Sequence, residues 1–125
     1  MNDIFGNNIL VGRRSLDYLW TKMTASLTNI ANVDTPGYKA KYVTFEDTYR
    51  SALRNASGNR EAVRRAADGA VWQVKASETE SARLDGNNVL EDTEQTELTR
   101  TAIQYQYMLS SINSDIARLS SVIKG

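Results

Sequence analysis

The 125-residue sequence contains no cysteine and no histidine. Without cysteine, the chain can form no disulfide and has no thiol nucleophile. The two absences together remove the usual ligands of zinc and copper, and the lack of histidine removes the commonest general base. No nucleophile elbow, phosphate-binding loop or glycine-rich fingerprint occurs either. We therefore predict no catalytic, cofactor-binding or metal-binding residue, and expect the protein not to be an enzyme.

The sequence also lacks a net charge, because 15 basic residues balance 15 acidic ones. This balance argues against nucleic acid as the main partner. The charges are unevenly placed, however. Residues 1–75 carry 11 basic and 7 acidic side chains, whereas residues 76–125 carry 4 and 8. The two halves should therefore attract each other, within one molecule or between neighbouring molecules.

A further absence is that of long apolar runs. No stretch approaches the roughly 18 apolar residues that indicate a membrane-spanning helix. Residues 1–12 are interrupted by polar side chains, and no basic residue comes before Arg13. We therefore expect neither a direct membrane span nor a cleaved secretory signal peptide.

The sequence does contain the same seven-residue apolar rhythm near each of its ends. The spacing alternates between four and three residues, which places an apolar stripe along one side of a helix. Such a stripe, here called a seam, needs a partner, so two seams indicate assembly rather than a pocket. We expect the N-terminal seam to pair with the stretch from Leu109 to Leu119. The seam residues are Leu16, Trp20, Met23, Leu27 and Ile30, and then Leu98, Ala102, Tyr105, Leu109, Ile112, Ile116, Leu119 and Ile123.

The length suits one domain, 1–125. We predict a mainly α-helical fold in which an N-terminal helix (7–32) and a C-terminal helix (89–124) pair as a coiled coil. Gly12 should weaken the start of the first helix, whereas acidic residues at the start of the second complement its dipole. The intervening residues 33–88 should contain a turn, a short helix, a small β-ribbon and a flexible loop.

Within this middle part, residues 38–45 and 71–76 have strand character and could pair as the ribbon. A pattern resembling a capping box at Thr44 predicts a short helix that ends near Asn55. Residues 56–70 hold only one large apolar side chain, so we predict a mobile loop there.

The most specific stretch is Asn-Ile-Ala-Asn-Val-Asp-Thr-Pro-Gly-Tyr, residues 29–38. Two asparagines at a helix end can satisfy orphan backbone carbonyls or bridge to a neighbour. Proline followed by glycine suits the centre of a type II turn and fixes the direction in which the chain leaves. On these terms alone the stretch is a well-made helix stop. The motif residues, including a second turn before the C-terminal helix, are Asn29, Asn32, Thr35, Pro36, Gly37, Tyr38, Asp85, Gly86, Asn87 and Asn88.

The first motif resembles the Asn-x-x-Asn-x-x-Thr-Pro-Gly-Tyr motif of the bacterial flagellar rod and hook proteins, in which it follows a terminal helix. The segment 84–89, the acidic helix start and Tyr105-Gln106-Tyr107 are similar to a proximal rod member of that family. The small size agrees, because distal rod and hook proteins carry large inserted domains. The resemblance covers residues 8–54 and 84–123.

The resemblance implies a structural subunit of the proximal rod of the flagellar basal body, part of the drive shaft that transmits torque for motility. Such a subunit is exported unfolded through the flagellar type III apparatus and self-assembles through its terminal helices into a helical tube that spans the periplasm. The implied partners are other rod proteins (FlgC, FlgF and FlgG), the adaptor FliE and the flagellar export gate.

Two alternatives stay open. The sister proximal rod protein FlgC shares the Thr-Pro-Gly-Tyr motif and is similar in length. A cytosolic coiled-coil adaptor or dimeric regulator, using the two helices as an antiparallel hairpin, would explain the seams but not the two motifs.

Overall fold

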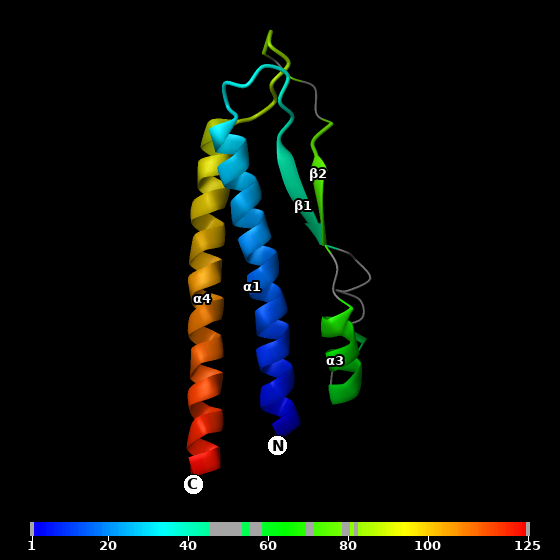
Figure 1. The fold of residues 1–125 in the computed structure, drawn as a ribbon, viewed down its shortest axis with the longest axis vertical. Coiled ribbons are helices and arrows are strands. Elements are labelled where there is room, and N and C mark those ends of the chain that lie inside the picture. Colours follow the sequence, from blue (N-terminus) through cyan, green and yellow to red (C-terminus); the bar gives the residue numbers. More distant parts are fainter. Residues whose placement is uncertain are drawn as a thin grey trace.

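Two long helices dominate the computed structural model, which describes residues 2–45, 54–55, 59–69, 72–78, 81 and 83–124. The helices lie side by side and antiparallel, so both chain ends lie at the same end of the molecule (Figure 1). A two-stranded ribbon and a short helix lie beside the N-terminal helix. The predicted mainly helical fold with paired terminal helices is confirmed. The elements are α1 (Asn2–Ala31), β1 (Lys41–Phe45), α3 (Arg60–Asp68), β2 (Trp72–Ala76) and α4 (Glu91–Lys124).

The two long helices differ slightly from their predicted bounds. α1 begins at Asn2, before the predicted start at residue 7, and runs through Gly12 without a break. It ends at Ala31, one residue earlier than predicted, and α4 begins at Glu91 rather than at residue 89. No helix in the described part of the chain is long and apolar enough to cross a membrane.

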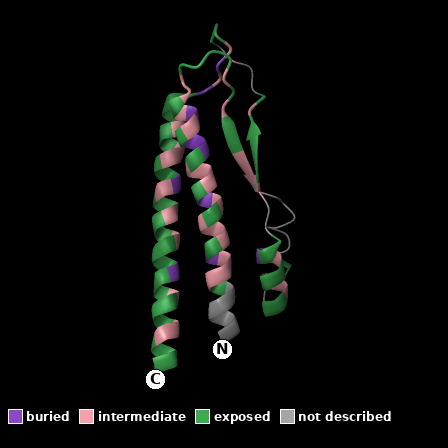
Figure 2. Cartoon of the chain, viewed as in Figure 1, coloured by how far each residue is buried: buried purple, intermediate pink, exposed green. Residues whose placement is uncertain are grey.

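The contact between α1 and α4 is made by a few buried residues on each helix, which Figure 2 shows among exposed ones. In α1 they include Gly12, Leu19 and Ser26, at seven-residue intervals, and in α4 they are Thr101 and Ile112. Gly12 therefore has a packing role that offsets its low helix propensity. A Cβ added to it would lie 2.7 Å from Cγ1 of Ile112, so the absence of a side chain lets the two helices approach closely.

The register of this helix pair follows from its cross-contacts. Lys22 forms an ion pair with Glu97 at 3.6 Å, and the rings of Trp20 and Tyr105 are 6.2 Å apart. Because the helices are antiparallel, Leu27 lies near the start of α4. The predicted pairing of the whole N-terminal seam with residues 109–119 is therefore wrong within one chain.

The predicted ribbon is confirmed. β1 and β2 pair antiparallel with Lys41 opposite Ala76 and Phe45 opposite Trp72. The ribbon is fastened to α1 through Trp72. The centroid of its indole ring lies 6.0 Å from the centroid of the Tyr18 phenol ring, and the Arg14 guanidinium lies over the indole, 4.9 Å from its centroid. A two-stranded ribbon is marginal by itself, so this anchor supplies the support it needs.

The predicted mobile loop at 56–70 is wrong for most of its length, because α3 occupies residues 60–68. The side chain of Asn59 caps this helix by accepting a hydrogen bond from the backbone N–H of Ala62 at 3.0 Å. Ala67 is fully buried, and α3 packs against α1. Small alanines have high helix propensity and allow close packing, which compensates for the shortage of large apolar residues.

The short helix predicted from Thr44 to Asn55 falls mostly outside the described residues. Its first two residues, Thr44 and Phe45, belong to β1 instead. Residues 54–55 are helical.

Replacement of Gly12 by alanine tests the close approach of the two long helices. Alanine favours helix by about 1 kcal/mol, but overpacking against Ile112 costs about 1–3 kcal/mol. We expect Gly12→Ala to lower the melting temperature measured by circular dichroism. Ile112→Ala should remove the clash, so the double variant should be more stable than the sum of the two single effects. Strict additivity would contradict this contact.

Candidate functional site

The two motif segments, 29–38 and 85–88, meet where α1 ends and α4 begins (Figure 1). We call this meeting point the junction. The structure brings all ten motif residues into or beside it, although the two segments lie about 50 residues apart in the sequence. The side chains of three asparagines, at positions 29, 87 and 88, join these segments to each other and to the ribbon.

Asn87 lies at the centre of the junction and is fully buried. Its Nδ2 lies 2.8 Å from the carbonyl oxygen of Asn32, 3.1 Å from that of Val33 and 2.8 Å from that of Thr35. Its Oδ1 accepts the backbone N–H of Val89 at 2.8 Å. These three residues lie in the turn after α1, so this one amide bonds the backbone of that turn to the segment that leads into α4.

Asn29 is also fully buried and fastens β1 to α1. Its Nδ2 donates to the carbonyl oxygen of Lys41, and its Oδ1 accepts the backbone N–H of Lys41, both at 2.8 Å. The Tyr38 hydroxyl lies 3.4 Å from the same Oδ1. The asparagine amide thus pairs with the edge of β1 as a neighbouring strand would.

Asn88 closes the open end of the ribbon. The backbone N–H of Ser77 donates directly to the carbonyl oxygen of Ala40 at 2.6 Å. In the opposite direction, the Asn88 amide stands between the two strands: its Oδ1 accepts the N–H of Ala40, and its Nδ2 donates to the carbonyl oxygen of Ser77 at 3.3 Å. The chain just before α4 is therefore bonded to the ribbon as well as to the end of α1.

The other motif residues shape the two turns. Thr35 donates its hydroxyl to Oδ1 of Asn32 at 3.0 Å, and Pro36 is exposed. Gly37 and Gly86 have φ angles of +73° and +77°, which favour glycine. The backbone N–H of Gly37 donates to the carbonyl oxygen of Asp85 at 2.7 Å, so the two turns are bonded directly to each other.

Sequence reasoning missed Arg83. Its guanidinium donates to the carbonyl oxygen of Val33 at 2.7 Å and pairs with the Asp85 carboxylate at 3.3 Å. It thereby shares with Asn87 the carbonyl of Val33, in the turn after α1. Arginine is a suitable donor for helix-end carbonyls, but only the fold shows that Arg83 reaches them.

The seam residues divide into two groups. Those nearer the helix contact are partly buried: Leu16, Met23, Ile30, Leu98, Ala102, Tyr105 and Leu119, with Ile112 buried. The others are exposed, with Trp20 at 61% and Leu27 at 54% of their accessible surface. The contact between α1 and α4 is therefore centred on Leu19 and Thr101. These residues lie to one side of the apolar stripe that the spacing indicates. The remaining exposed seam residues are Leu109, Ile116 and Ile123.

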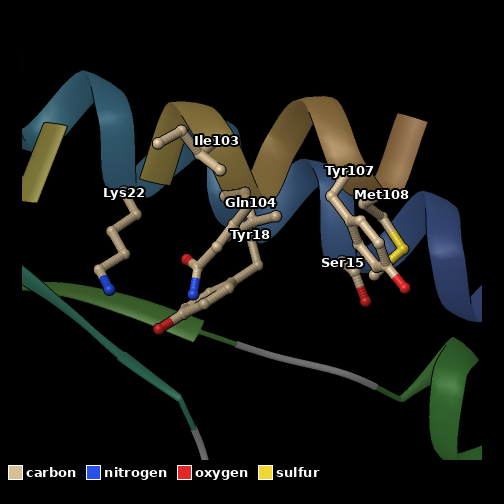
Figure 3. A pocket seen from close by; sticks show the side chains of 8 residues that line it. Ser15, Tyr18, Lys22, Ile103, Gln104, Tyr107 and Met108 are labelled. Atoms are coloured by element: carbon tan, nitrogen blue, oxygen red, sulfur yellow. The ribbon is translucent and has the colours of Figure 1, made fainter. Parts of the chain in front are cut away.

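An open groove of about 570 Å³ lies between α1 and α4, with Ile103 and Tyr107 on its α4 side (Figure 3). Two of its polar groups are already engaged: the Ser15 hydroxyl donates to the carbonyl oxygen of Val11 at 2.9 Å, and Lys22 pairs with Glu97. The groove therefore offers a surface for contact rather than an arrangement for chemistry. Within the described residues, no group of His, Cys, Asp or Glu is placed to hold a metal ion.

Replacement of Asn87 by alanine tests the junction. It leaves the N–H of Val89 without its partner. It also removes one of the donors to the carbonyl oxygens of residues 32, 33 and 35 in the turn after α1, which keep one donor each. We expect the free energy of unfolding to fall by about 3 kcal/mol, measured by urea denaturation. Asn113→Ala, at an exposed position of α4, is the control and should change it by less than about 0.5 kcal/mol. Equal effects would contradict a special role for Asn87.

The Tyr38 phenol gives the junction a dependence on pH. Burial raises its pKa above the ordinary value of 10.0, and the negative charge of Glu94 raises it further. The fold therefore favours the neutral phenol, and this contribution to stability is full below pH 10 and is lost as pH rises through the folded-state pKa. From pH 8 to pH 10.5, the free energy of unfolding should fall more for the native chain than for Tyr38→Phe. Parallel decreases would contradict this account.

Comparison with known proteins gives the chain its family. No protein-family model matches it. It is 35% identical over 107 residues to the flagellar basal body rod protein FlgB of Bacillus subtilis (strain 168), with 83% of each chain covered. It is 34% identical over 128 residues to FlgB of Cereibacter sphaeroides, with 97% of each chain covered, and 26% identical over 107 residues to FlgB of Escherichia coli (strain K12), with 77% of this chain and 78% of the relative covered. The chain therefore belongs to the family of flagellar basal body rod proteins FlgB.

Proposed function

We propose that the chain is a structural, non-enzymatic subunit of the proximal rod of the bacterial flagellar basal body. The observation that carries this proposal is the similarity to relatives named FlgB over most of the chain, in bacteria as different as Bacillus and Cereibacter. The sister rod protein FlgC and a cytosolic regulator are not favoured, since these relatives share one name.

The exposed residues of the seams support self-assembly through the terminal helices. Trp20 and Leu27 are seven residues apart on α1, and Leu109 and Ile116 are seven residues apart on α4. On antiparallel helices whose facing sides carry Leu19 and Ile112, these positions fall on the same side of the pair. Repeated exposed apolar positions of this kind mark a contact surface. In our proposal a neighbouring subunit covers this surface in the rod.

The remaining expectations fit this proposal. The subunit would reach the rod through the flagellar type III apparatus and span the periplasm as part of a helical tube. Its neighbours would be FlgC, FlgF and FlgG, with FliE and the export gate at its base. The motif residues of the junction would act by holding the helix pair in the shape that docks.

Deletion of the gene in its host tests the proposal. We expect loss of rods, hooks and motility, seen by electron microscopy of basal bodies and by swimming assays. The native gene should restore all three. Leu27→Asp should restore less than about a tenth of motility, because a charge would be buried in the subunit contact.

Thr93→Asp provides the control, since it adds the same charge at an exposed position in the first turn of α4. It should restore motility fully. Normal flagella in the deletion strain would overturn the rod proposal. Full activity of Leu27→Asp would instead reject the exposed seam as the contact surface.

A further inference from the structure

The outer side of α4 carries an unusual apolar surface. Ile103 is nine residues from the buried Ile112, so it lies on the side of the helix away from that contact, where it also borders the groove between α1 and α4. Ile103 is 64% exposed, and Tyr107, one turn further, is 75% exposed. No charged residue occurs from Thr101 to Ser114. Outer faces of solvent-exposed helices normally carry charges, so this surface has the character of one that is covered.

A second apolar feature lies across the molecule, between α1 and the ribbon. It is a groove of about 360 Å³ lined by threonines of α1, with Trp20 and Val74 among its apolar residues. Val74 is 51% exposed. Thr28, which also lines the groove, is nine residues from Leu19 and so lies on the side of α1 opposite α4. One copy therefore cannot place the outer side of its own α4 in its own groove.

The two features lie at matching levels along the molecule. The Trp20–Tyr105 contact places the groove beside the level of Ile103 and Tyr107. Lys41 lines the groove at the junction end, because its backbone is bonded to Asn29 near the end of α1. A second copy that lies parallel to the first, with no shift along the long axis, would therefore bring its Ile103 to the level of Trp20 in the first copy.

Charge favours the same arrangement. Glu91 and Asp92 are exposed at the start of α4, at the same end of the molecule as Lys41. In the described residues, none of these three side chains has an ion-pair partner within 4.0 Å. The acidic half of one chain and the basic half of the next would thus meet in the same contact.

We propose that the outer side of α4 in one copy docks in the groove between α1 and the ribbon of a second copy. This inference rests on the proposed function and names a lateral contact of the rod subunit. Each copy offers one apolar surface and one groove on opposite sides. The contact is therefore heterologous, and it can repeat from copy to copy around a tube rather than close into a dimer.

Cysteine pairs test the contact directly, because the native chain has no cysteine. The variant Val74→Cys/Ile103→Cys would be expressed in the deletion strain and its basal bodies treated with a mild oxidant. Disulfides need Cα atoms within about 7 Å, so only neighbouring copies that are docked as proposed would be joined. We expect a ladder of covalent oligomers on a denaturing gel.

Each single-cysteine variant should give no ladder, and neither should Leu84→Cys/Ile103→Cys, whose first cysteine lies in an exposed turn before α4. A double variant that builds rods but gives no ladder overturns the docking while leaving the rod function intact. If the deletion strain remains motile, the rod function fails by itself. The docking is then decided by the ladder from the purified double variant at high concentration.

A charge exchange gives an independent reading if the cysteine variant builds no rods. Lys41→Glu and Asp92→Lys should each lower swimming motility at least threefold, and the two together should restore at least half of it. The matched control combines Lys41→Glu with Asp115→Lys, since Asp115 lies near the other end of α4 beside Arg118. That pair should not recover. Absence of recovery in the first pair would overturn the proposal.

Discussion

The structure depends on one buried side chain, the amide of Asn87, and on the carbonyls it satisfies. A turn that is covered by other chain segments must find donors for its backbone carbonyls, because a carbonyl that is removed from water without a hydrogen bond destabilises the fold. Asn87 serves the residues at 32, 33 and 35 and also holds the backbone that leads into α4. The turn that follows α1 is therefore bonded to the segment that precedes α4, which fixes the relative direction and level of the two helices.

The other two asparagines extend this connection to the ribbon. Asn29 reaches β1 from within α1, and Asn88 bridges both strands from the segment before α4. These contacts explain why the motif residues come in two separate groups along the sequence. The groups complete each other's hydrogen bonds within one chain, so their immediate role is to define the subunit. In our proposal, contact with other subunits is made by the helix faces.

The sequence predicted the long helices well, because a four-three apolar spacing sustained over several turns has few other physical solutions. The ribbon was also predictable from the strand character of its two segments. The helix α3 was missed because its packing relies on alanines, which bury little area and resemble a polar loop in composition. The junction was recognised only as two turns. Periodicity carries no signal that Asn87 would reach the carbonyls near Asn32, since that contact exists only after distant segments meet.

The antiparallel contact of α1 with α4 has a consequence for the order of folding. Lys22 and Glu97 are brought together across 75 positions of chain, and closing a loop of that length costs roughly 4 kcal/mol of entropy before any contact offsets it. Leu19 can be buried only once Thr101 and Ile112 are present. The first half of the chain thus has little core of its own, so folding is postponed until nearly the last residue is available. High contact order makes this step slow relative to local helix formation. A chain that is released with its N-terminus first therefore stays unfolded until most of its residues are free.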